Sequence, residues 1–77
     1  MPNHFHFNEQ TTRAVYDFIA AYIGINEISP SVREIGEGTY MSHSNVFRYL
    51  ERLEAKGLIQ RKEGCARSIR ILEPYPR

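Results

Sequence analysis

The stretch SVREIGEGTYMSHSNVFRYLERLEAKGL, residues 31–58, holds the start signals of two helices that follow each other closely. Its first four residues form a capping box, in which the Ser31 hydroxyl accepts from the backbone of Glu34 and the Glu34 carboxylate reaches back. This pattern predicts a short helix over 31–37. The two glycines and the threonine that follow in GEGT leave this helix little capacity to continue.

A second helix is predicted over 43–56. Ser42 is a good N-cap for it, and Lys56 followed by Gly57 is a strong stop, because glycine readily takes the left-handed conformation just past the last turn. Apolar residues recur at helical spacing along the segment and predict a buried stripe of Val46, Leu50 and Leu53, with Tyr49 beside it. The two helices and the short turn between them form a pair.

The segment that precedes this pair predicts a first helix over 8–23. Asn8 or Thr11 would cap its start, and Gly24 would close it. Its apolar residues also recur at helical spacing and predict a core face: Val15, Phe18, Ile19, Tyr22 and Ile23.

The segment LIQRKEGCARSIRIL predicts a β-hairpin over 58–72, with its turn near Gly64. The closing EPYPR is interpreted as an extended tail or the start of a linker. The fold class is therefore mainly α with a small β-hairpin, in a single domain over 1–77. Three helices followed by a two-stranded wing make a winged helix-turn-helix.

Composition excludes several other classes of protein. The 77 residues hold a single cysteine, Cys65, so no internal disulfide can form, and the sequence predicts no metal site, cofactor or small-molecule ligand. His4 and His6 lack a third ligand. No apolar run is long enough for a membrane span and no secretory pattern is present, so a cytoplasmic location is expected. No serine has a histidine and aspartate set around it, so we expect no enzyme activity.

Charge divides the chain into two unlike halves. Residues 1–41 carry a net charge of −3 and residues 42–77 carry +4, although the whole chain carries only +1. Such asymmetry is a mild indication of a polyanionic partner.

The helix over 43–56 carries polar side chains suited to reading DNA. Asn45, Arg48 and Arg52 are spaced by three and four residues and therefore share a face, which Ser44 and Phe47 border. Asparagine pairs with an adenine edge, arginine with guanine, and an aromatic ring can rest against a thymine methyl. Arg52 lies more than a turn further along the helix and is expected to meet phosphate.

The segments PSVREIGE (30–37), SNVFRYLERLEAKGLIQR (44–61) and GCARSIRIL (64–72) together resemble the N-terminal DNA-binding domain of LexA-type repressors, a winged helix-turn-helix. The resemblance covers about 11–72. Its connection GEGTYMSHS reads as one residue shorter than the family's Glu-Ala-Leu-Gly-Leu-Ser pattern and lacks the apolar Leu-Gly-Leu signature. The self-cleaving peptidase domain of these repressors is not matched, so damage-triggered self-cleavage is not expected of this chain.

The resemblance implies roles for individual residues. The family's base-reading positions fall on Ser42, Ser44, Asn45, Phe47 and Arg48. Positions suited to phosphate contact fall on Ser31 and Arg33, and the wing tip falls on Gly64, Arg67 and Ser68. The wing also carries Arg61 and Lys62, with Arg70 behind its tip, and we expect the wing to meet adjacent phosphates or the minor groove.

The sequence therefore predicts a sequence-specific reader of double-stranded DNA, repressor-like, with a possible homodimer on paired half-sites. An alternative is a winged-helix protein-interaction module that uses Phe47 as its anchor and does not read DNA sequence. The basic wing and the polar residues beside Phe47 favour the DNA reader.

Overall fold

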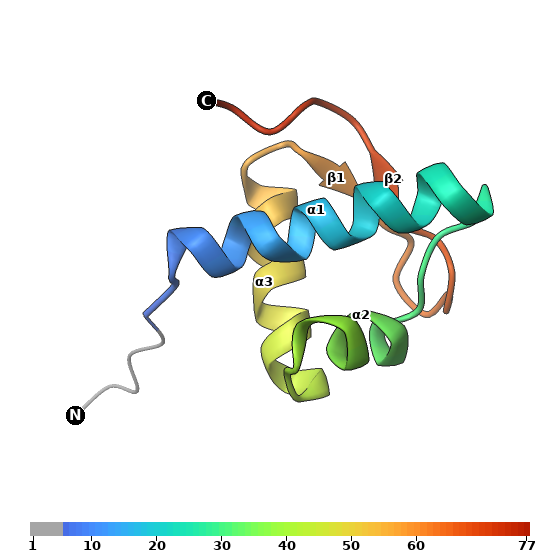
Figure 1. Cartoon of the computed structure of the whole chain (residues 1–77), viewed down its shortest axis with the longest axis horizontal. Coiled ribbons are helices and arrows are strands. Elements are labelled where there is room, and N and C mark those ends of the chain that lie inside the picture. Colours follow the sequence, from blue (N-terminus) through green and yellow to red (C-terminus); the bar gives the residue numbers. More distant parts are fainter. Residues whose placement is uncertain (1–5) are drawn as a thin grey trace.

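The computed structural model describes residues 6–77. Three helices are followed by a two-stranded antiparallel sheet, and α1 crosses α3 while α2 lies below α1, beside the lower end of α3 (Figure 1). This arrangement confirms the predicted winged helix-turn-helix. The elements are α1 (Glu9–Asn26), α2 (Val32–Thr39), α3 (His43–Ala55), β1 (Ile59–Gln60) and β2 (Arg70–Ile71).

The helix starts are set by the capping groups that the sequence indicated. The Asn8 side chain accepts from the Thr11 amide and caps α1. Ser31 and Glu34 form the complete capping box of α2. Ser42 caps α3 by accepting from the amide of Asn45. Each cap satisfies an amide that has no partner within its helix, so these three starts are fixed by local chemistry.

The end of α3 is also as predicted. Gly57 takes the left-handed conformation at φ 76°, and its amide donates to the Glu54 carbonyl. The Leu58 amide folds back onto the carbonyl of Leu53 at 3.0 Å. This pair of bonds is a Schellman motif, which turns the chain out of α3 and into the wing.

Helix α1 ends three residues later than expected. Gly24 lies inside the helix rather than closing it, and the left-handed residue that ends α1 is Glu27, at φ 61°. The Glu27 amide donates to the carbonyl of Ile23, and the Asn26 side chain donates to the Tyr22 carbonyl. Glycine weakens a helix interior by only about 1 kcal/mol, which these bonds can offset.

Helix α2 also runs further than expected, through both of its glycines to Thr39. A Cβ on Gly36 would lie 2.7 Å from the Met41 carbonyl oxygen, and one on Gly38 would lie 2.0 Å from the Phe18 ring. These glycines therefore serve close packing rather than helix termination. The turn between α2 and α3 is Tyr40 to Ser42.

Tyr40 ends α2 in the left-handed conformation, at φ 58° and ψ 47°. The Met41 amide then donates to the carbonyl of Gly36. The turn thus keeps a backbone shape that usually requires glycine.

One core joins all five elements. The fully buried side chains come from α1, α2, α3, β1 and the loop residue Pro30, and Ile71 of β2 packs against them. The core cluster is Val15, Tyr16, Ile19, Ile35, Val46, Tyr49, Leu50, Leu53, Leu58, Ile59 and Ile69. The predicted stripe of α3 is buried in full. In α1, Phe18, Tyr22 and Ile23 are only partly buried, and Tyr16 takes a core position that the spacing did not indicate.

The wing hairpin is short but has a definite register. Ile59 pairs with Ile71 and Gln60 with Arg70. Gly64 forms the tip at φ 82°, as predicted for the turn. The Ser68 hydroxyl closes the loop, since it accepts from the Lys62 amide at 2.8 Å and lies 3.0 Å from the Lys62 carbonyl.

The C-terminal residues, which we expected to be a free tail or linker, contact α1. The Tyr75 hydroxyl donates to Glu9, and its ring packs edge-on against Tyr16 at 5.4 Å. The Tyr16 hydroxyl donates to the Glu73 carbonyl, and the Arg13 guanidinium lies 5.3 Å from the Tyr75 ring centre. Tyr75 is an anchor that proline-rich composition did not reveal. No helix in the described part of the chain has the length and apolar character of a membrane span.

Candidate nucleic-acid interface

The start of α3 presents its polar residues to solvent. Ser42, Ser44, Asn45, Phe47 and Arg48 are all exposed, while Val46 between them is fully buried. The Ser42 hydroxyl lies 3.3 Å from that of Ser44, so these two residues also stabilise the first turn. The five residues that we expected to read bases therefore occupy the outer side of one helix.

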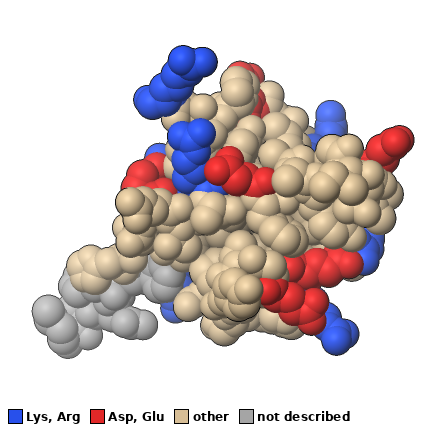
Figure 2. Space-filling view, viewed as in Figure 1, with Lys and Arg blue, Asp and Glu red and all other residues tan. Residues whose placement is uncertain are grey.

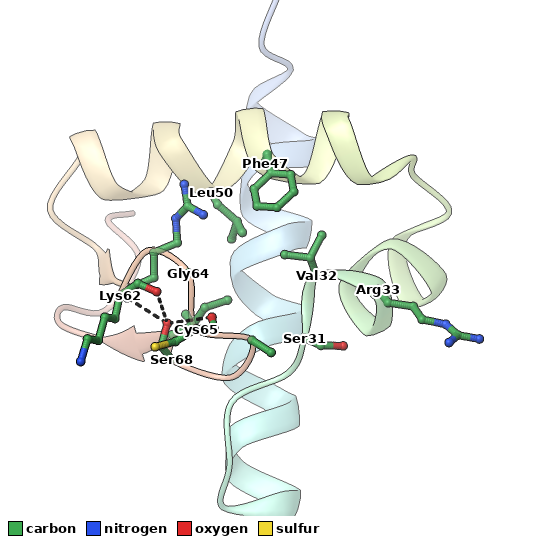
Figure 3. Close-up of a pocket in the computed structure, with 12 residues that line it drawn as sticks. Ser31, Val32, Arg33, Phe47, Leu50, Lys62, Gly64, Cys65 and Ser68 are labelled. Atoms are coloured by element: carbon green, nitrogen blue, oxygen red, sulfur yellow. Dashed lines mark hydrogen bonds between the residues drawn. The ribbon is translucent and has the colours of Figure 1, made fainter.

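Phe47 occupies the wing side of this surface. Its ring is 43% exposed and lies 5.5 Å from the guanidinium of Arg61. Phe47 and Leu50 point from α3 toward α2 and the wing loop, and Val32 faces them (Figure 3). These residues line a hollow of about 390 Å³ between α2, α3 and the wing. Part of the Phe47 ring is therefore covered by neighbouring side chains of the same chain, and the rest is open to solvent.

The two residues expected to meet phosphate at α2 differ in their geometry. The Ser31 hydroxyl is occupied by the cap, where it accepts from the Glu34 amide at 3.2 Å. Arg33 is exposed and points away from the hollow (Figure 3). Its guanidinium lies 3.3 Å from Glu37 one turn later, a surface pair of small energetic weight.

Arg52 is directed toward the N-terminal end of α1. Its guanidinium lies 3.5 Å from the Glu9 carboxylate and 4.7 Å from the centre of the Phe7 ring. The pKa of Glu9 is lowered, first by the hydrogen bond from Tyr75 and then by Lys56 and Arg52. Arg52, which we expected to meet phosphate, is only partly exposed and connects α3 with the start of α1.

Two of the basic residues of the wing are held in ion pairs within the protein. Arg61 contacts Glu54 of α3 at 2.9 Å. Arg67 donates from both terminal nitrogens to Glu34, at 2.8 and 3.0 Å, and donates to the Ser29 carbonyl at 3.0 Å. The pKa of Glu34 falls to about 2, mainly because of Arg67 and then because of the Ser31 amide. The pKa of Arg67 rises for the same reason.

Lys62 differs from these two arginines. Its side chain is exposed, points away from the hollow (Figure 3), and has no ion-pair partner among the described residues. Gly64 and Ser68 shape the tip rather than offering charge, because Gly64 supplies the turn and the Ser68 hydroxyl closes it. Fewer basic side chains of the wing are therefore without an ion pair than the number of basic residues in its sequence suggested.

Charge on the rest of the molecule is mixed. The face that shows α1 intersperses acidic and basic side chains over a larger uncharged area (Figure 2). Within residues 6–77, histidine, cysteine, aspartate and glutamate form no cluster of three that could hold a metal ion. Cys65 is an exposed free thiol, and His4 lies outside the described residues.

The fold and the exposed face of α3 agree with a comparison against known families, in which the LexA DNA binding domain matches residues 9–68. The chain belongs to the LexA DNA-binding domain family. It is 44% identical to the LexA repressor of Moorella thermoacetica and 43% identical to that of Exiguobacterium sibiricum, each over 63 residues. These matches cover 80% of this chain and 31% of each relative.

A third relative, the LexA repressor of Koribacter versatilis, is 40% identical over 63 residues, which is 80% of this chain and 30% of the relative. The chain spans about a third of the length of the curated relatives it matches. Membership in the LexA DNA-binding domain family makes this a DNA-binding domain of the helix-turn-helix class and not a catalytic one, as the sequence predicted.

Sequence reasoning did not find the partners of the charged residues in this LexA-type domain. Glu34 was assigned only to the capping box, although it also accepts from Arg67, 33 residues away. Glu54, Ser29 and Tyr75 had no assigned role. The carboxylate of a capping-box glutamate has two oxygens, and the Ser31 amide donates to only one of them. The remaining capacity to accept a hydrogen bond was the signal in the sequence that Glu34 has a further donor.

Proposed function

We propose that this chain binds double-stranded DNA in a sequence-specific manner as the DNA-reading part of a repressor-like transcriptional regulator. The exposed N-terminal half of α3 carries this proposal. Ser42, Ser44, Asn45 and Arg48 combine hydrogen-bond donors and acceptors on the outside of a helix whose inner face is fully buried. Such a helix can enter a major groove without disturbing the core that supports it.

The roles within α3 follow from chemistry and position. Asn45 suits an adenine edge and Arg48 a guanine edge, and both stand in the first half of the helix. Phe47, with its half-exposed ring, suits contact with a thymine methyl at the wing side of the groove. Arg33 and Lys62 flank this region with exposed positive charge and suit phosphate oxygens.

The regulator-level proposal rests on the relatives. The three LexA repressors named above match this chain at 40–44% identity. We infer that the chain represses transcription by occupying an operator, that it works where the chromosome lies, in the cytoplasm and nucleoid, and that two copies occupy paired half-sites. A single domain with one reading helix covers few base pairs, so pairing supplies affinity and specificity together.

The decisive experiment is selection of bound duplexes from a random library, followed by affinity measurements at two salt concentrations. A defined motif with two-fold symmetry, and a weaker affinity for scrambled duplexes, are the expected results. Binding without a motif would reduce the proposal to a general electrostatic surface. The absence of binding would favour the alternative in which Phe47 anchors a protein interface.

A further inference from the structure

The basic residues of the wing separate into two sets by their positions in the hairpin. Side chains alternate between the two faces along a strand, and directly paired residues share a face. From the register, Ile59 and Ile71 share the inner face, whereas Gln60 and Arg70 share the outer one. Continuing this alternation by two residues puts Arg61 on the inner side and Lys62 on the outer side.

The inner arginine of the first strand is bound to α3. Arg61 is only 19% exposed, pairs with Glu54 at 2.9 Å, and covers the Phe47 ring at 5.5 Å. The pair joins two residues seven apart across the Gly57 turn. It therefore fixes the direction in which the wing leaves α3.

The second anchor is Arg67, which binds the wing to α2 and the preceding loop. Its four hydrogen bonds reach Glu34 twice, the Ser29 carbonyl and the Tyr22 hydroxyl. Ser29 is buried and its hydroxyl accepts from the Ile69 amide at 3.0 Å, so the same loop also fixes the backbone two residues further on. A bidentate arginine with a further carbonyl partner has few donors left for a phosphate.

Lys62 and Arg70 have a different environment. Both are exposed, and neither has an ion-pair partner among residues 6–77. All four basic residues line one open hollow of about 630 Å³ beside the hairpin, so it is the missing ion pairs that set Lys62 and Arg70 apart. Releasing counterions from phosphate requires cations that are not already neutralised, which these two residues provide.

We propose that the wing divides its basic residues by role. Lys62 and Arg70 bind phosphate, whereas Arg61 and Arg67 are positioning residues that fix the wing to α3 and α2 through Glu54 and Glu34. This inference rests on the proposed DNA binding. It assigns Arg70 a contact that its place behind the wing tip did not suggest, and it moves Arg67 from contact to positioning.

The test is the salt dependence of duplex binding, measured by fluorescence anisotropy as the slope of log affinity against log salt concentration. We expect Lys62→Gln and Arg70→Gln each to reduce the slope by about 0.9, the change for one phosphate contact. Arg61→Gln and Arg67→Gln should weaken binding several-fold at every salt concentration and leave the slope unchanged. Thermal unfolding followed by circular dichroism shows the range of temperatures over which each variant is folded, and binding is measured within that range.

A second variant separates the two roles of Arg67 by the sign of its effect. If Arg67 contacts phosphate, Glu34→Gln removes a competing carboxylate and strengthens binding. If Arg67 positions the wing, Glu34→Gln loosens the anchor and weakens binding several-fold. Glu27→Gln is the matched control, because it makes the same change in net charge at an exposed site with no ion pair among the described residues.

The possible failures are distinguishable. Equal losses of slope in all four wing variants, or tighter binding by Glu34→Gln than by Glu27→Gln, would overturn the division of roles while leaving DNA binding intact. A wild-type chain that bound no duplex would overturn the proposed function, together with the phosphate role of Lys62 and Arg70. In that case a double-mutant cycle of Arg67→Gln and Glu34→Gln, measured by thermal unfolding, would still test whether Arg67 anchors the wing to α2. If the two losses of stability were additive, the anchoring role would be overturned.

Discussion

Tyr40 holds a backbone conformation that L-amino acids other than glycine adopt at a cost. At φ 58° and ψ 47° it is left-handed, and its side chain is 95% exposed. The left-handed conformation costs roughly 1–2 kcal/mol for a residue with a Cβ, and an exposed ring offers little packing to offset that. Glycine at this position would remove the steric cost but lose more chain entropy on folding.

We therefore expect Tyr40→Gly to stabilise the free protein by about 0.5–1 kcal/mol, measured by urea denaturation. The matched control is Gly57→Ala, which places a Cβ at φ 76° and should destabilise the protein by about 1 kcal/mol. A destabilised Tyr40→Gly would mean that the tyrosine ring makes a stabilising contact in solution.

Asn45 and Arg48 are the residues at which base reading is tested most directly. We expect Asn45→Ala and Arg48→Ala each to cost about 1–3 kcal/mol of binding free energy on the selected motif and to relax selectivity at one base pair. Lys62→Ala, as the control, should weaken selected and random duplexes alike. If Asn45→Ala also lowered both affinities equally, the base-reading assignment would be wrong. Competition binding against single-base variants of the motif measures the difference.

At the scale of the elements, α2 depends on a glycine for its contact with the turn that leads to α3. A Cβ on Gly36 would meet the Met41 carbonyl oxygen at 2.7 Å, and backbone atoms there cannot move aside without shifting the turn. We expect Gly36→Ala to destabilise the protein by about 1–3 kcal/mol, despite the higher helix propensity of alanine.

Gly24 provides the control for this prediction. It lies inside α1, and a Cβ there would meet nothing within 4 Å. Gly24→Ala should therefore stabilise the protein by up to about 1 kcal/mol, the difference in helix propensity alone. In urea denaturation the two variants should change the free energy of unfolding in opposite directions. Changes in the same direction would mean that helix propensity, and not close packing, determines the effect of alanine at Gly36.

The contact of the wing with α2 should make stability depend on pH. Arg67 and the Ser31 amide lower the pKa of Glu34 to about 2 from its usual 4.5. Below pH 4.5 the Glu34 carboxylate is protonated in the unfolded chain but stays ionised in the folded protein. The stabilisation from its ion pair is therefore complete above about pH 5 and is lost as the pH falls toward 2. We expect the stability difference between wild type and Glu34→Gln to shrink over that interval in urea titrations. A constant difference would show that the pair is not formed in solution.

The elements also show which features could be predicted from sequence. The helix starts at Asn8, Ser31 and Ser42, and the stop at Gly57, were predictable because each depends on groups within a few residues. The end of α1 was not, because the bonds around Glu27 compensate a glycine whose effect is small. The helix propensity of a single residue determines where a helix ends only when no hydrogen bonds beyond that residue extend the helix.

At the scale of the whole molecule, the limits of prediction come from distance along the chain. The exposure of Asn45 and Arg48 followed from helical spacing and is confirmed, whereas Arg52, on the same face, is only partly exposed. The Arg67 to Glu34 pair joins residues 33 apart, and the Tyr16 hydroxyl reaches Glu73 over 57 residues. No local pattern encodes such pairs. The charge of the wing was therefore visible in the sequence, but the ion pairs that hold Arg61 and Arg67 were not.

Pairing on DNA is the last consequence at this scale. Among residues 6–77, the exposed large apolar side chains are distributed over α1, the loops, α3 and the wing, rather than gathered on one element: Phe7, Ile25, Ile28, Tyr40, Phe47 and Leu72. Stable dimers usually bury about 800 Å² from each partner, largely apolar at the centre. We therefore expect the free chain to sediment as a monomer at micromolar concentration.

On a duplex with two half-sites one helical turn apart, we expect two chains per duplex and tighter binding than on a single half-site, because each copy then presents its α3 to the same side of the DNA. Analytical ultracentrifugation with and without each duplex measures both stoichiometries. Inserting about five base pairs between the half-sites turns them to opposite sides and is the control. If affinity survives that insertion, the two copies bind independently, and specificity must come from α3 and the wing of each copy alone.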